Sequence, residues 1–189
     1  SGHTELFERE FIAFHVSGGT TEALLVRPDE EKLLHIDIVG RTLDLNAGQA
    51  VDRVGVAMGL SFPAGAELEK AALESRKTFK LKPCVKGTDC CLSGIENKCL
   101  DMIKSGESKC DVALFCLDSV AAALEKMTEN ILKKYGRLPL VFAGGVMSNS
   151  IIRQRFTKEV GAYFAEPAFS ADNAAGTAYL TYLREQKNA

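Results

Sequence analysis

The segment FIAFHVSGGTTEALLVRP, residues 11–28, places two glycines and a cluster of hydroxyl side chains between two apolar runs. Because β-branched and aromatic residues dominate both runs, residues 11–16 and 22–27 are predicted to be strands around a Gly-Gly turn. Residues 33–39 alternate well enough to form a third strand. The simplest arrangement of these three strands is an antiparallel meander.

The turn at Gly18 and Gly19 has two interpretations. It can be an ordinary hairpin turn, or it can cradle a phosphate, because glycine bares consecutive backbone N–H groups and has no Cβ to keep an anion away. Ser17, Thr20 and Thr21 add hydroxyl donors. Neither GxxxxGK[ST] nor GxGxxG occurs in the chain, so a nucleotide site here would have to be built without the usual fingerprints.

The rest of the chain reads mainly as helices with two later strands. Apolar periodicity predicts helices over residues 46–59, 66–76, 94–104, 110–135, 149–159 and 172–186. Residues 138–143 and 162–167 are predicted strands, and residues 77–93 are predicted to be a loop with one short strand. Antiparallel strands followed by β-α-β-α indicate a mixed α/β layer fold whose later strands are parallel.

Composition narrows the class of protein. The 189 residues carry a formal net charge of -2, so nucleic-acid binding would need a local basic patch or a partner. No apolar stretch is long and uniform enough to span a bilayer, which predicts no membrane association. The cysteines lack CxxC spacing, so we expect reduced thiols in a cytoplasmic protein. They are Cys84, Cys90, Cys91, Cys99, Cys110 and Cys116.

Two more stretches suggest a ligand site. Gly144 and Gly145 follow the predicted strand 138–143, and ligands collect at the carboxyl ends of strands in open α/β sheets. Two glycines there would let a flat ring approach the backbone, and Asn149 can bond a ligand or cap the next helix. Asp52 can accept the hydroxyls of a ribose, or it can be an ordinary surface carboxylate.

Two smaller observations concern packing and metals. Gly48, Gly55 and Gly59 weaken the helix that contains Asp52, which suggests that something packs closely against it. Asp172 precedes the last helix and is either its N-cap or a metal ligand. A single carboxylate does not hold a transition metal, because three or four ligands are needed.

Taken in order, five segments resemble one family. They are VSGG (16–19), AGQAVDRVGVAMGLSFPAG (47–65), LSGIENK (92–98), AGGVMSN (143–149) and ADNAAGTAYL (171–180). The chain resembles the TsaD family, the catalytic subunit of the tRNA threonylcarbamoyladenosine synthase, earlier known as O-sialoglycoprotein endopeptidase or glycoprotease. The resemblance extends from about residue 11 to residue 185.

The resemblance implies an α/β lobe of the actin-like ATPase (ribonuclease H-like) fold, a mixed sheet flanked by helices. Such proteins have two lobes with nucleotide between them, and residues 11–189 resemble the C-terminal lobe, with the N-terminal lobe absent. Residues 1–10 are then an expression scar or a linker. His3 is either part of that scar or a second metal ligand, and the scar is favoured.

The resemblance also implies roles for individual residues. The phosphate-binding loop falls on Val16, Ser17, Gly18 and Gly19, with Thr20 next to it. Asp52 and Gly65 fall where the family binds the adenosine part, and Gly144, Gly145 and Asn149 match its nucleotide-binding segment. Asp172 matches the aspartate that completes an iron or zinc site.

Four departures from the family pattern change the predicted site. Thr20 stands where the family usually has histidine, and Gln49 where it has glutamate. A double-aspartate segment is reduced to Asp44, and FSGLKT has become LSGIENK, residues 92–98. Losing carboxylates and a histidine alters the charge of a cleft and its acid–base chemistry.

The function implied for the full-length protein is binding of ATP or an adenylate and metal-dependent threonylcarbamoyl transfer to a tRNA adenine, with accessory proteins. The present chain alone is expected to be inactive and to self-associate through an uncovered apolar face. One alternative is a non-catalytic paralogue for nucleotide binding or protein association. A third is a metallopeptidase, for which the sequence shows no HExxH helix and no serine–histidine–aspartate pattern.

Overall fold

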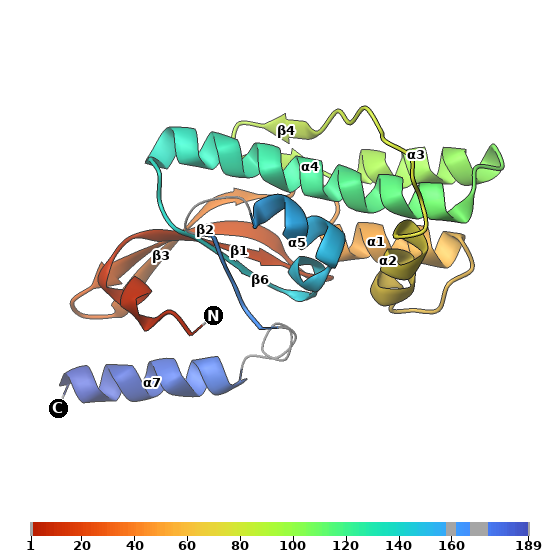
Figure 1. The fold of residues 1–189 in the computed structure, drawn as a ribbon. Coiled ribbons are helices and arrows are strands. Elements are labelled where there is room, and N and C mark those ends of the chain that lie inside the picture. The colour runs from red at the N-terminus through yellow and green to blue at the C-terminus, as the bar shows by residue number, and fades with distance from the viewer. Residues whose placement is uncertain (1, 158–161, 167–173, 189) are drawn as a thin grey trace.

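A five-stranded mixed sheet forms the centre of the molecule in this computed structural model, which describes residues 2–157, 162–166 and 174–188 (Figure 1). The strands, in sheet order, are β3 (Leu33–Arg41), β2 (Thr21–Asp29), β1 (Phe11–Val16), β6 (Leu140–Ala143) and β7 (Ala162–Phe164). β1 pairs antiparallel with β2, and β2 pairs antiparallel with β3. β6 pairs parallel with β1 and with β7. The predicted meander and the predicted parallel strands are both confirmed.

Helix α4 lies over one face of this sheet with α3 beside it, α1 and α2 lie at one end of the strands, and α7 lies on the other side of the sheet (Figure 1). The helical elements are η1 (Thr4–Glu8), α1 (Ala47–Ala57), α2 (Gly65–Ala72), α3 (Ser93–Lys104), α4 (Lys109–Tyr135), η2 (Gly145–Ser148), α5 (Ser150–Phe156) and α7 (Ala174–Asn188). Leu6 of η1 is buried. That residues 1–10 are a scar or linker stays a prediction.

The core lies between α4 and the sheet. The apolar stripe predicted along α4 is buried throughout, and its members are Val112, Cys116, Val120, Leu124, Met127 and Ile131. Phe14 of β1 and Phe142 of β6 stack with ring centroids 5.1 Å apart, and Phe156 of α5 packs on Phe142 at 4.8 Å. Burial of these large side chains against α4 is the main favourable term that fixes the parallel strands under the helix layer.

Two predicted boundaries are confirmed by their local geometry. Asn46 occupies the N-cap position of α1. Gly136 ends α4 with φ +89°, a conformation that glycine adopts without steric cost, and its N–H donates to the Leu132 carbonyl at 3.0 Å.

Two other predictions need correction. The helix predicted over residues 66–76 ends at Ala72, and the Ser75 hydroxyl donates to Asp111 of α4 at 2.6 Å. Within residues 77–93 there are two short strands, β4 (Cys84–Lys86) and β5 (Asp89–Cys91), where one was expected. They form a hairpin because Gly87 takes φ +63° in the turn, which the irregular apolar pattern of this region did not indicate.

Two features of the described residues concern the predictions on membranes and on self-association. In the described part of the chain, no helix combines the length and the apolar character needed to cross a bilayer. Ile36 and Ile38, on the edge strand β3, are 54% and 57% exposed. Self-association of the chain stays a prediction.

Candidate functional site

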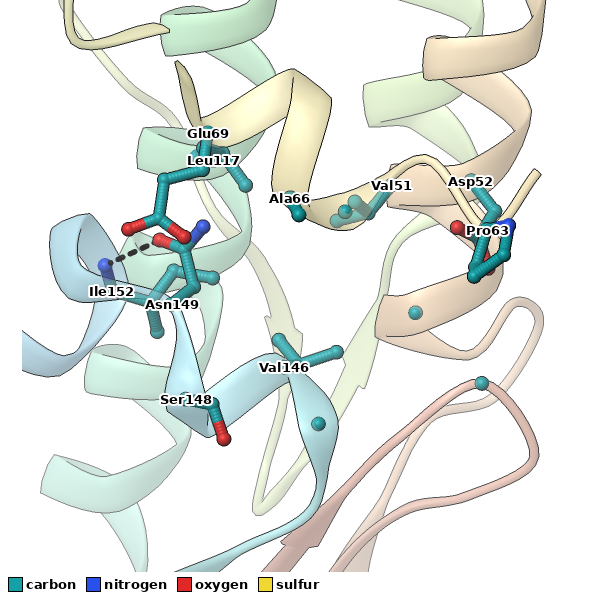
Figure 2. A pocket seen from close by; sticks show the side chains of 14 residues that line it. Val51, Asp52, Pro63, Ala66, Glu69, Leu117, Val146, Ser148, Asn149 and Ile152 are labelled. Carbon is teal, nitrogen blue, oxygen red and sulfur yellow. Dashed lines mark hydrogen bonds between the residues drawn. The ribbon is translucent and has the colours of Figure 1, made fainter. Parts of the chain in front are cut away.

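A cavity of about 360 Å³ opens at the carboxyl ends of the parallel strands β1 and β6 (Figure 2). The turn after β1 supplies Gly18, and η2, which follows β6, supplies Gly145. Helices α1, α2, α4 and α5 complete the walls. The lining residues are Gly18, Gly48, Val51, Asp52, Pro63, Gly65, Ala66, Glu69, Leu117, Gly145, Val146, Ser148, Asn149 and Ile152.

Five of the ten residues predicted to bind nucleotide line this single cavity, although they come from the turn after β1, from α1 and α2, and from the segment after β6. They are Gly18, Asp52, Gly65, Gly145 and Asn149. The other five do not line it and are Val16, Ser17, Gly19, Thr20 and Gly144. The structure therefore brings together one residue or more from each predicted nucleotide segment.

The glycine turn presents backbone N–H groups while its carbonyls are engaged. The Ser17 carbonyl accepts from the Gly48 amide at 3.0 Å, and the Gly19 carbonyl accepts from the Asn46 side chain at 2.9 Å. The amides of Gly18 and Gly19 have no hydrogen-bond partner in the part of the chain that the structure describes. Such bared amides are suited to an anion.

The hydroxyl of Ser17 is used inside the turn. Its Oγ accepts from the Thr20 amide at 3.1 Å, and the Ser17 amide donates to the Thr20 carbonyl at 2.7 Å. Thr21 likewise accepts from the Ala47 amide at 2.9 Å and is buried. The hydroxyls of Ser17 and Thr21 therefore hold the turn and the start of α1.

Close packing accounts for two of the glycines. A Cβ on Gly48 would lie 2.6 Å from the Gly18 nitrogen, so α1 can rest on the turn only because residue 48 has no side chain. Gly144 has φ +100°, and a Cβ there would run into the Val16 carbonyl. Gly144 therefore serves the contact between β1 and the segment after β6, whereas Gly145 is the one that borders the cavity.

Asp52 projects from α1 toward one end of the cavity, beside Pro63 (Figure 2). Its Oδ1 accepts from the Ala64 amide at 2.8 Å, which orients the carboxylate. No other hydrogen bond to Asp52 is present among the described residues, so its second oxygen can accept from a ligand hydroxyl. Asp52 also lines a neighbouring cavity of about 470 Å³, where Arg53 pairs with Glu96 at 3.2 Å.

Asn149 lies at the other end of the cavity and is also the N-cap of α5 (Figure 2). Its Oδ1 accepts from the Ile152 amide at 3.1 Å, and the residue is 8% exposed. Because Oδ1 caps the helix, the Nδ2 group is the part that can donate to a ligand. The cap and ligand interpretations of Asn149 are therefore compatible.

Sequence reasoning missed Glu69, which borders the cavity next to Asn149 (Figure 2). The Glu69 carboxylate accepts from the Ser150 amide at 2.7 Å and also from the Ser150 hydroxyl, and so joins α2 to the start of α5. On a helix read alone, Glu69 looks like an ordinary surface carboxylate. Its partner lies 81 positions away, so no local pattern could have indicated the contact.

Asp44, Gln49 and Ser93, from the segments that depart from the family pattern, do not line the cavity. The Asp44 carboxylate accepts from the Leu92 amide at 2.7 Å and from the Ser93 hydroxyl at 2.5 Å. Desolvation opposes ionisation of Asp44, but hydrogen bonds from Ser93 and nearby amides outweigh it, and the pKa falls below its ordinary value. The Gln49 side chain accepts from the Asn46 amide at 3.4 Å at the start of α1.

A metal site is not assembled in the part of the chain that the structure describes. That part contains no group of three or more histidine, cysteine, aspartate or glutamate side chains that could hold a metal ion. Asp172, the predicted ligand, lies outside the described residues. His3 contacts Glu5 at 3.0 Å, its ring centroid is 4.1 Å from that of Tyr163, and it lines a cavity with Phe11 and Tyr179, not the one that holds Asp52.

The fold and the cavity between the ends of β1 and β6 define a class. A solved structure of (R)-2-hydroxyglutaryl-CoA dehydratase component A from Acidaminococcus fermentans superposes with a TM-score of 0.59 at 16% identity, covering 96% of this chain and 63% of that one. This likeness shows the fold alone. The chain is a lobe of the actin-like ATPase fold, as the sequence implied.

Within that class, the family is shown directly. The family model for TsaD, the tRNA N6-adenosine threonylcarbamoyltransferases, matches residues 3–179, and the chain belongs to this family. A relative from Kosmotoga olearia with that name is 33% identical over 190 residues, 95% of this chain and 56% of the relative. A probable bifunctional tRNA threonylcarbamoyladenosine biosynthesis protein from Thermoplasma volcanium is 30% identical over 184 residues, 92% of this chain and 34% of that protein. The chain therefore spans about half the length of the transferases it matches, or less for the bifunctional protein.

Proposed function

We propose that this chain binds an adenine nucleotide or adenylate in the cavity between Gly18, Asp52 and Asn149, and that it does so for threonylcarbamoyl transfer to a tRNA adenine. The main support for this proposal is that these three residues, which come from three segments far apart in the sequence, line the same cavity. The volume of about 360 Å³ lies within the range usual for small-molecule sites.

Different residues of the cavity lining suit the base, the ribose and the phosphate of an adenine nucleotide. Apolar side chains, among them Val51, Ala66, Leu117, Val146 and Ile152, form walls for a flat ring. At one end the free oxygen of Asp52 would accept from ribose hydroxyls, and at the other the Asn149 amide would donate to the base. The bared amides of Gly18 and Gly19 would receive the phosphate.

In the proposed reaction the exocyclic N6 amine of the tRNA adenosine attacks the carbamoyl carbon of an adenylate. The bond from that carbon to the phosphate oxygen breaks, AMP leaves with the electron pair, and the amine releases one proton to solvent. Backbone donors at Gly18 and Gly19 would stabilise the charge that grows on the leaving phosphate, because they are already oriented before the reaction. Asp52 and Asn149 would hold the adenosine part and so fix the position of that phosphate.

Iron or zinc, bound with the help of Asp172, remains a separate proposal. When bound, such a metal would polarise the acyl oxygen as a Lewis acid. Metal analysis of purified wild-type protein and of the Asp172→Ala variant tests it. The described residues hold no complete metal site, so we expect stoichiometric metal only in the full-length protein and its loss in the variant of that protein, and equal metal content in both would reject the role of Asp172.

The greater length of the relatives and the accessory proteins both bear on catalytic turnover. We expect the 189-residue chain assayed alone to bind nucleotide without transferring threonylcarbamoyl groups, since relatives named as the transferase are about twice as long. The alternative proposal is a protein that binds nucleotide and never transfers. It is favoured by the described part of the cavity lining, which contains Asp52 and Glu69 but no histidine, and by the use of both carboxylates in structural hydrogen bonds.

Two measurements separate these outcomes. Calorimetric titration of the chain with ATP and with AMP should show one binding site, and Asp52→Ala should lower the affinity for both nucleotides. If neither nucleotide produces binding heat, the cavity is not a nucleotide site. Transfer of a labelled threonylcarbamoyl group to tRNA, measured with the full-length protein and its accessory proteins, should produce modified tRNA. Nucleotide binding without any transfer would support the non-catalytic alternative.

A further inference from the structure

A second cavity, of about 580 Å³, lies away from the nucleotide site, between the segment before β4, the start of α3 and the middle of α4. Three lysines border it: Lys80 and Lys82 from the first segment and Lys98 from α3. Its other lining residues are Leu81, Pro83, Cys84, Cys91, Ser93, Gly94, Ile95, Phe115, Ser119 and Ala123. Among the residues that the structure describes, no acidic side chain lines it, although the chain as a whole carries a net charge of -2.

Lys80 and Lys82 belong to the basic strap, which we define as residues 76–86, RKTFKLKPCVK. The strap contains five basic residues and no acidic one. Figure 1 shows it running from α2 over α4 to β4. Its side chains alternate, because Phe79 and Leu81 are half-buried while Lys80 and Lys82 are exposed. Phe79 packs edge-on against Phe115 of α4 with ring centroids 5.3 Å apart, which fixes the side from which the lysines project.

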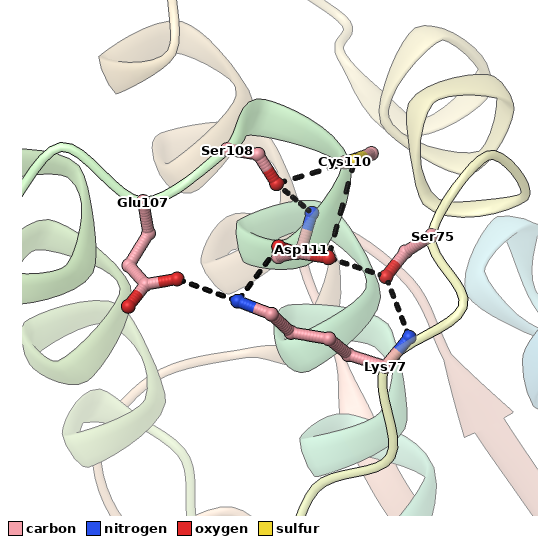
Figure 3. Close-up of polar contacts among 6 residues, drawn as sticks. All are labelled: Ser75, Lys77, Glu107, Ser108, Cys110 and Asp111. Atoms are coloured by element: carbon pink, nitrogen blue, oxygen red, sulfur yellow. Dashed lines mark hydrogen bonds and ion pairs between the residues drawn. The ribbon is translucent and has the colours of Figure 1, made fainter.

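Both ends of the strap are anchored by polar contacts. At the start, Lys77 lies 2.8 Å from Glu107 and 2.8 Å from Asp111, and Ser75 also bonds Asp111 (Figure 3). At the far end the Asn130 side chain donates to the Gly87 carbonyl at 2.6 Å. The lysines between these anchors are therefore carried on a positioned segment of backbone.

Glu107 and Asp111 compensate the charge of Lys77, but no described carboxylate pairs with the three lysines that line the cavity. Lys80, Lys82 and Lys98 form no ion pair with any described residue. The nearby Asp44 carboxylate is taken up by Ser93 and backbone amides and does not line the cavity. Cys91, which faces Cys84 across the hairpin, adds no negative charge at neutral pH, because burial raises the pKa of its thiol.

We propose that the basic strap and Lys98 form a docking surface for the phosphate backbone of RNA. The identification of that RNA as tRNA rests on the proposed function. Convergent unpaired lysines on a chain of net negative charge provide the local patch that phosphate binding requires, because each lysine that neutralises a phosphate releases a bound counterion. Lysines that act as point charges position a nucleic acid and carry no sequence information, so the surface would hold RNA while another site selects the adenosine.

The test is a fluorescence anisotropy titration of an unmodified tRNA transcript with the 189-residue chain at several salt concentrations. The variant K80Q/K82Q/K98Q removes the three cavity charges. The matched control K32Q/K133Q/K134Q removes three exposed lysines elsewhere. We expect the control to bind as the wild type does. We expect the cavity variant to bind at least about tenfold more weakly and to lose about one unit of salt slope per lysine.

Equal tRNA affinity of the two triple variants, or no measurable tRNA binding by the wild type, would overturn the proposal. With the first result, an acidic protein surface would replace RNA as the binding partner of the three lysines. If the triple variant misfolds in part, single substitutions of each lysine provide a second test. Each should lower the slope of the salt dependence by about one unit.

ATP titration of the cavity variant separates the docking proposal from the nucleotide-site proposal. Unchanged ATP binding with lost tRNA binding supports the docking surface, whereas lysine-dependent tRNA binding without any ATP binding refutes the nucleotide site alone.

Discussion

The Asp52 carboxylate of α1 accepts the Ala64 amide at 2.8 Å, and this contact aims the side chain at the cavity that Asn149 closes from the other end. Because one oxygen is held by the backbone, the other has a fixed direction before any ligand arrives. A ligand hydroxyl would therefore meet an oriented acceptor.

Replacing Asp52 by asparagine should weaken adenine-nucleotide binding while the fold is kept. A hydrogen bond to a charged group is worth about 1.5–3 kcal/mol, so we expect a loss of roughly tenfold to a hundredfold in affinity. The side-chain amide oxygen in the D52N variant can still accept from the Ala64 amide. Isothermal calorimetry measures the affinity, and thermal unfolding checks the fold. An affinity equal to that of the wild type would remove Asp52 from the site.

Substituting Gly48→Ala should destabilise the protein. A Cβ at this position would lie 2.6 Å from the Gly18 nitrogen, and α1 would have to move off the turn. Overpacking of this kind costs about 1–3 kcal/mol. The control is Gly94→Ala in α3, where a Cβ would meet no atom within 4 Å, and where we expect no loss and a gain of up to about 1 kcal/mol. Equal unfolding midpoints in urea for the two variants would contradict the packing account.

The two roles of Asn149 can be separated by comparing two substitutions. Asn149→Ala should lose the α5 cap, which costs about 1 kcal/mol, and should also lose nucleotide affinity. Asn149→Asp should keep the cap, because aspartate is an equally good N-cap residue, but it removes the Nδ2 donors. We expect Asn149→Asp to be as stable as the wild type and weak in nucleotide binding. Full affinity in this variant would assign Asn149 to capping alone.

The anchor of the basic strap should respond to acid. Lys77, followed by Ser108 and Ser75, lowers the pKa of Asp111 from 3.8 to about 2 (Figure 3). A carboxyl whose pKa is depressed in the folded state stabilises that state above its unfolded pKa and loses the effect as the pH falls through the folded value. The free energy of unfolding of the wild type should therefore exceed that of Asp111→Asn at neutral pH. The difference should shrink between about pH 4 and pH 2. A difference independent of pH would show that the ion pair contributes nothing.

Much of this architecture could be predicted from local sequence. Runs of β-branched and aromatic residues located β1 and β2, and alternation located β3, although its Ile36 and Ile38 are exposed. The stripe along α4 located the core, because it marks the buried side of that helix. The hairpin β4–β5 could not be located in the same way, since three-residue strands are too short for a pattern and depend on Gly87 and on the Asn130 contact.

The site was predicted in part, and the failures have a common physical cause. The sequence pattern singles out Asp52 and Asn149, the resemblance adds Gly65, and the fold brings all three to one cavity. Which glycines would border the cavity depended on the spacing between β1, α1 and the segment after β6, and that spacing is set by tertiary packing. Glu69 was missed for the same reason, because its contact with Ser150 joins two elements far apart in the chain.

The most direct test of the nucleotide site is a two-dimensional amide NMR titration of the chain with ADP. We expect the amide signals of Gly18, Gly19, Gly65 and Gly145 to shift and to saturate together at a single dissociation constant. The chemical shifts of the basic strap should not change. Shifts confined to other regions, or no change at millimolar ADP, would contradict the claim that Gly18, Asp52 and Asn149 enclose an adenine-nucleotide site.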